Sequence, residues 1–235
     1  GACRNEYETD IIGGNTFDYP YLHGKAAVNT GYSFCSASAK AVEKKQIILT
    51  GYSAVDLILG KQRSTTIGQG TCGTDFRTFS PEMQQALREF SDAGGNLFVS
   101  GCYVLSDLWN NSADDSNDHK FAEQILHATL DRNEAVRQGR VRIVATPTNE
   151  FSRGEYRFHV ALGPDHYTVE SADALQPAGE NATIVMRYAE NGRTAGVAST
   201  GNGRTFVMGF PFETLQTQRE RDRLMHDILH FLTKR

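Results

Sequence analysis

The sequence predicts an α/β protein, a three-layer sandwich with a mainly parallel sheet and an antiparallel extension at about residues 140–200. Two observations carry this prediction. Residues 80–109 have the pattern of a helix, a buried strand, a sharp turn and a second apolar run, which is typical of parallel sheets flanked by helices. Further along, residues 183–188 and 194–198 have strand character and are joined by Asn191-Gly192, a strong hairpin-turn signal.

The clearest local signals lie in residues 80–109. Ser80 is a good N-cap and Pro81 suits the first helical position, and the helix should end at Gly94-Gly95. The apolar residues between them recur at helical spacing: Met83, Ala86, Leu87 and Phe90. A short apolar strand, residues 96–100, then ends abruptly at Gly101-Cys102-Tyr103. Cys102 is therefore expected at the carboxyl end of a buried strand, where open α/β sheets place their ligand sites.

The part before this stretch predicts a βαβ unit. Residues 1–18 are polar and form an irregular lead-in, and the single domain covers residues 19–235. Its expected elements are a short helix at 19–28, a strand at 31–35, a helix at 36–45, a strand at 54–59 and a surface loop at 60–79.

The later part predicts one more helix, several strands and a closing helix. The helix is expected at 118–130, and further strands at 141–145, 156–160 and 203–210. Thr217 and Glu220 form a capping box, after which an apolar stripe predicts that the last helix packs on the sheet.

Composition excludes several classes of function. A chain of 235 residues with 39% hydrophobic residues can bury the core of one domain. The net charge of −4 and the absence of a basic cluster argue against nucleic acid as a partner. No apolar run approaches the roughly 18 residues of a membrane span. The four cysteines lack metal-type spacing, the carboxylates near Asp114 and Asp118 lack the pattern of a calcium loop, and no cofactor signature is present.

Several segments resemble a known family. The motifs are Ala54–Gly60, Phe79-Ser80-Pro81, Gly94–Gly101, Ser106-Asp107-Leu108 and Gly209–Thr214. They resemble a domain of secreted bacterial proteins of the xanthan lyase or golvesin-like type, similar in fold to class I glutamine amidotransferases, a flavodoxin-like sandwich. The resemblance covers about residues 15–235. It implies polysaccharide as a partner, further domains in a longer parent chain, and a secreted, periplasmic or cell-surface location. It also implies a first sheet strand that lies outside this chain.

The amidotransferase resemblance also implies a set of catalytic residues. Those enzymes carry a Cys nucleophile at a strand-to-helix elbow and a His-x-Glu pair after a late strand. Cys102 matches the nucleophile and Glu213 matches the glutamate, but Pro211 stands where the histidine would be. Without an imidazole as base, an ordinary thiol of pKa near 8.5 is mostly protonated at neutral pH.

The sequence leaves three functional hypotheses. The first is a non-catalytic scaffold or carbohydrate-binding module, in which Tyr103, Asp107 and Trp109 beyond the elbow line a sugar-binding cleft. The second is a hydrolase or amidase that depends on Cys102, with a histidine from elsewhere as base. The third is direct lyase action on an acidic polysaccharide, for which only the pair His166-Tyr167 has suitable residue types.

Overall fold

The computed structural model describes residues 19–67, 74–110, 115–144, 150–163 and 166–234. The predicted lead-in at 1–18 and Asp114 of the carboxylate-rich loop lie outside these ranges. The strands are β1 (Ala54–Gly60), β2 (Thr65–Ile67), β3 (Thr74–Phe76), β4 (Asn96–Gly101), β5 (Ala128–Arg132), β6 (Arg140–Ile143), β7 (Glu155–Arg157), β8 (Ala174–Pro177), β9 (Ala182–Tyr188), β10 (Thr194–Thr200) and β11 (Arg204–Met208). The helices are α1 (Tyr19–Asn29), α2 (Ala39–Glu43), α3 (Pro81–Asp92), α4 (Ser106–Asn110), α5 (Asp115–Phe121) and α6 (Gln218–Thr233).

The main sheet is mixed and largely antiparallel. Among the described residues its strands follow the order β1-β4-β11-β10-β9-β6-β7, and β8 and β5 attach beside β10. Of the strand pairs in the described part of the sheet, only β1/β4 and β4/β11 are parallel. The prediction of a mainly parallel sheet is therefore wrong. The reason is the connections, since parallel pairing needs a long crossover, whereas short turns such as Asn191-Gly192 join antiparallel neighbours.

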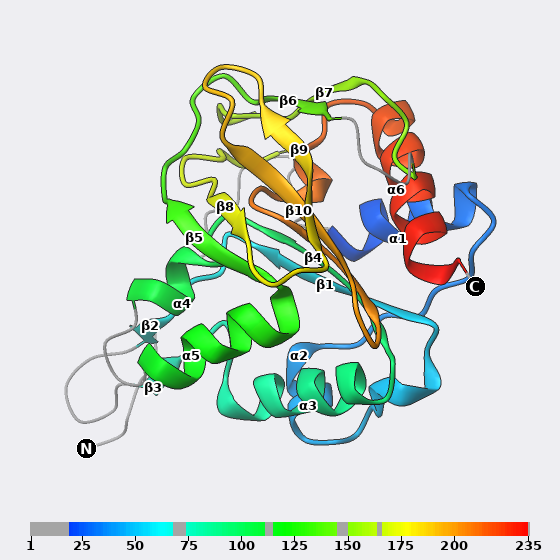
Figure 1. The fold of residues 1–235 in the computed structure, drawn as a ribbon, viewed down its shortest axis with the longest axis vertical. Coiled ribbons are helices and arrows are strands. Elements are labelled where there is room, and N and C mark those ends of the chain that lie inside the picture. Colours follow the sequence, from blue (N-terminus) through cyan, green and yellow to red (C-terminus); the bar gives the residue numbers. More distant parts are fainter. Residues whose placement is uncertain (1–18, 68–73, 111–114, 145–149, 164–165, 235) are drawn as a thin grey trace.

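Helices cover both faces of the parallel part of the sheet, as the sandwich prediction requires (Figure 1). On one side α6 packs on β1, β4 and β11, and α1 packs beside α6. On the other side α3 packs against β4. Because side chains alternate along a strand, β4 contributes to both cores: Phe98 faces the α6 side, and Leu97 and Val99 face the α3 side.

The strongest sequence signals are confirmed. Helix α3 begins after Ser80, whose Oγ accepts the backbone N–H of Met83 at 3.1 Å. Helix α6 begins with the predicted capping box of Thr217 and Glu220. The hairpin between β9 and β10 turns at Gly192, whose φ of 72° suits glycine.

The predicted βαβ unit is wrong in its first strand. Residues 31–38 have no regular structure and are almost entirely exposed, and α2 starts only at Ala39 after the N-cap Ser38. A strand requires a neighbour for its backbone groups. In the described part of the chain β1 is the edge of the sheet, so no partner strand is available to residues 31–35. The first strand outside this chain stays a prediction.

Three further differences from the prediction lie in the middle of the chain. The helix predicted at 118–130 is α5 followed by a π-helical turn, Ala122–Leu126, which ends at His127 with φ 52°. The chain then continues as β5, which pairs with β8, and neither strand was predicted. The loop predicted at 60–79 contains the small antiparallel pair β2/β3.

Within the described residues, no helix has the length and apolar character that a membrane crossing requires.

Candidate functional site

The elbow after β4 places Cys102 in the interior. Its backbone N–H donates to the carbonyl of Gly60 at 2.8 Å, and its side chain is 0% exposed. Burial, followed by the negative charges of Glu213 and Glu170, raises the pKa of the Cys102 thiol. The thiol is therefore protonated at neutral pH and has no access to solvent.

A buried carboxylate that was not predicted from the sequence holds the chain beyond the elbow. Asp173 Oδ2 accepts the backbone N–H groups of Leu105 at 2.8 Å and Ser106 at 2.9 Å, just where the short helix α4 begins. Burial raises the pKa of Asp173 to about 7, although these hydrogen bonds favour the charged form. Asp173 thus fixes the direction in which the chain leaves Cys102.

Glu213 belongs to a buried network with His23. Its carboxylate accepts the Tyr167 hydroxyl at 2.8 Å and lies 3.1 Å from His23 Nε2. The other ring nitrogen of His23, Nδ1, lies 2.7 Å from Asp56 Oδ2. Burial by itself would lower the pKa of His23, but the carboxylates of Asp56 and Glu213 outweigh it and raise that pKa to about 9. The histidine is therefore an imidazolium at neutral pH.

The same network decides whether His23 can serve as a general base for Cys102. A general base needs a free ring nitrogen within hydrogen-bond reach of the proton that it removes. Both nitrogens of His23 are taken by carboxylates, and in the described part of the chain no hydrogen bond joins a histidine to Cys102 Sγ. Glu213 thus contacts a histidine, but one that comes from α1 and is already fully engaged.

The three residues predicted to bind sugar have different surroundings. Asp107 accepts the Ser64 backbone N–H at 2.6 Å and its hydroxyl at 2.8 Å, and so it anchors the loop that leads to β2. Tyr103 lies under the guanidinium of Arg63, 5.7 Å from the ring centroid. Trp109 stacks on the ring of His119 at 4.2 Å. Their role in sugar binding stays a prediction.

The two residues of the lyase-type pair, His166 and Tyr167, have different partners. Tyr167 belongs to the Glu213 network, whereas the ring of His166 stacks on that of His159 at 3.6 Å. The described residues contain no group of three or more candidate metal ligands.

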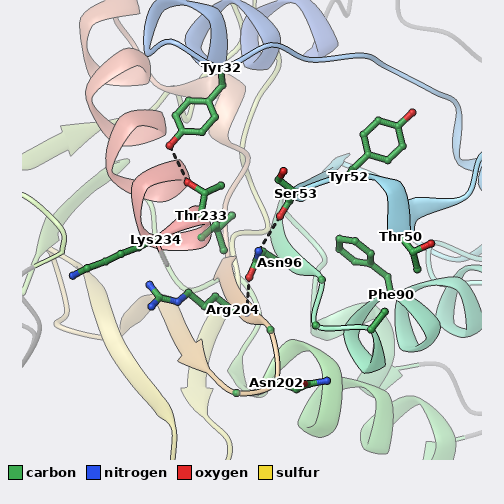
Figure 2. Close-up of a pocket in the computed structure, with 16 residues that line it drawn as sticks. Tyr32, Thr50, Tyr52, Ser53, Phe90, Asn96, Asn202, Arg204, Thr233 and Lys234 are labelled. Atoms are coloured by element: carbon green, nitrogen blue, oxygen red, sulfur yellow. Dashed lines mark hydrogen bonds between the residues drawn. The ribbon is translucent and has the colours of Figure 1, made fainter.

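A pocket of about 590 Å³ lies at the end of the sheet opposite the Cys102 elbow, where the parallel strands β1, β4 and β11 begin (Figure 2). Asn96 joins two of its walls, since it donates to the Ser53 carbonyl at 2.8 Å and accepts the Arg204 backbone N–H at 3.0 Å. The Tyr32 hydroxyl lies 2.9 Å from Thr233 Oγ1 and closes another side. No sequence motif indicated this pocket, because its walls come from five separate segments.

Comparisons with known proteins show the fold. The exo-β-1,4-mannosidase Op5Man5 from Opitutaceae bacterium strain TAV5 matches with a TM-score of 0.55 and 12% identity, over 98% of this chain and 34% of that chain. The mmIFT52 N-terminal domain matches with a TM-score of 0.52 and 11% identity, over 98% of this chain and 94% of that chain. This chain thus spans about a third of the mannosidase.

These likenesses support the amidotransferase-like, flavodoxin-like fold and give no support to a xanthan lyase. No protein-family model matches the sequence, and no curated protein matches it either. The α/β architecture is shared with a domain-sized part of a larger glycosidase.

Proposed function

We propose that this chain is a non-catalytic, amidotransferase-like scaffold domain of a larger secreted protein that processes polysaccharide. One observation carries the proposal: Cys102 is fully buried, and His23, the histidine that contacts Glu213, has both ring nitrogens engaged by carboxylates. The elbow therefore has the geometry of a nucleophile site without an accessible thiolate or a base. The mannosidase likeness supports a place beside a carbohydrate-active domain.

The test is the rate at which iodoacetamide alkylates each cysteine as a function of pH, read by peptide mass spectrometry. Cys35 is exposed and serves as the internal reference. We expect Cys102 to react at least about tenfold more slowly than Cys35 at pH 8, because it is buried and its pKa is raised. The variant C102S identifies the Cys102 signal. Fast alkylation with an apparent pKa below about 7 would overturn the proposal and favour the hydrolase hypothesis.

A second candidate function is carbohydrate binding at the pocket shown in Figure 2. Tyr52, which lines this pocket, has 41% of its surface exposed, and an exposed aromatic face beside hydroxyl and amide groups is suited to a sugar ring. Thr50, Ser53 and Asn202 supply such polar groups in the lining of the pocket.

We expect β-1,4-linked manno-oligosaccharide, chosen because of the mannosidase likeness, to bind the wild-type chain in isothermal titration calorimetry. Y52A should remove at least about 1 kcal/mol of that binding free energy, as loss of a stacking aromatic does. The matched control is Y21A, because Tyr21 is another exposed tyrosine, on α1, that does not line the pocket. Equal binding by Y52A and Y21A would contradict a site at this pocket. If neither the wild type nor the variants bind, carbohydrate binding at this pocket is ruled out and only the scaffold role is left.

A further inference from the structure

Two histidines on α6 stand one helical turn apart on its exposed side. His226 and His230 are both exposed, and the side chain of His226 retains 61% of its accessible surface. Their rings are nearly parallel, at 4°, with centroids 6.1 Å apart. Histidines at positions i and i+4 of a helix can bind one metal ion together, because both side chains project from the same face.

A buried carboxylate orients the first of these rings. Asp227 is only 4% exposed, and its carboxylate accepts the Ser152 backbone N–H at 2.8 Å, so it is held in place by the rest of the fold. Its Oδ1 lies 3.2 Å from His226 Nδ1. Histidines that bind metals usually donate one ring N–H to a carboxylate in this way, which leaves the lone pair on Nε2. The contact with Asp227 thus favours the tautomer of His226 that carries its proton on Nδ1 and leaves Nε2 available to a metal ion.

The cationic side chains one turn before and one turn after the pair have other partners. Arg223, one turn before His226, donates to the carbonyl of Arg153 and lies over the ring of Tyr156. Lys234, one turn after His230, has its ammonium group 3.3 Å from Glu150. Both cationic side chains are therefore held by partners other than the two imidazoles.

We propose that His226 and His230 form a two-histidine site for a divalent first-row transition-metal ion such as Ni²⁺, Cu²⁺ or Zn²⁺, ions that imidazole ligands suit. Water would occupy the remaining coordination positions, since the described residues offer no third protein ligand. The inference is independent of the proposed scaffold function, because the site lies on α6 and uses neither Cys102 nor the pocket.

The test is isothermal titration of the full chain, without an affinity tag, with NiCl₂ at pH 7.5. We expect one ion per chain, and at least about tenfold weaker binding in H226A and in H230A, because either change removes the chelate. The same titration at pH 5.5 should show weaker binding in the wild type, because protons compete for imidazole.

The matched control is R219H/H226A, which keeps the total at seven histidines but places the two on α6 eleven residues, or roughly 16 Å, apart. This variant should bind as weakly as H226A. Circular dichroism verifies that each variant is folded. Wild-type affinity in R219H/H226A, affinity unchanged in both single variants, or no binding by the wild type would each overturn the site.

Discussion

The variant H23A is expected to lower the free energy of unfolding by about 3–5 kcal/mol, the range for breaking a buried ion pair by removing one partner. The substitution leaves the Glu213 carboxylate buried, with Tyr167 as its remaining hydrogen-bond partner. It also empties space beside Phe212, whose ring centroid lies 4.7 Å from that of His23. Urea denaturation followed by circular dichroism measures the change.

Two companion variants separate charge from general damage to α1. N29A removes an exposed residue at the end of the same helix and should change stability by less than about 1 kcal/mol. H23L/E213L replaces both members of the buried pair with apolar side chains. It should recover much of the stability lost in H23A, as the replacement of other buried ion pairs by apolar residues does. A loss below about 1 kcal/mol in H23A would show that the network does not stabilise the fold.

The second expected result is a decline in stability with rising pH. The pKa of His23 is about 9 in the folded chain and about 6.5 when unfolded, so the folded state binds its proton more tightly. This contribution is fully present below pH 6.5 and is lost as the pH rises through about 9. Integrated over that window, the shift corresponds to roughly 3 kcal/mol.

Asp173 contributes in the same direction but at lower pH. Its pKa is about 7 in the folded chain against 3.8 for the free side chain, so its contribution declines as the pH rises from about 4 to 7. The window from pH 7 to 9 therefore belongs mainly to His23. Urea denaturation at half-unit steps from pH 7 to 9 should show a steeper decline in stability in the wild type than in H23A. Equal slopes in both chains would show that His23 does not titrate as the structure requires.

Elements with local signals could be predicted from the sequence. Ser80 and Pro81 start α3, Gly94-Gly95 follow its end, and Asn191-Gly192 turn the β9/β10 hairpin, because in each case the physical cause lies within a few neighbouring residues. Whether neighbouring strands run parallel or antiparallel could not be predicted in the same way. It depends on which distant strands pair, and β5 and β8 carry no period-two pattern strong enough to reveal them.

The candidate site was predicted only in part for the same reason. Cys102 was found because it follows a strand with a recognisable end, and Glu213 because it matches the glutamate of the amidotransferase His-x-Glu pair. The partner of Glu213 was missed, because His23 lies 190 residues away on a helix with no motif of its own. One usable signal was present in the sequence, since a glutamate expected in the interior needs a cationic or hydrogen-bonding partner, and Pro211 could not supply one.

The separation of His23 and Glu213 along the chain also bears on how the protein is made. Helix α1 packs mainly on α6 and on the 3₁₀ turn Phe212–Thr214, both of which the ribosome synthesises long after α1. Until these segments emerge from the ribosome, α1 lacks most of the surface on which it docks, and the aromatic face of β4 at Phe98 remains uncovered. A chain cut short before residue 212 would therefore lose its first helix together with its last.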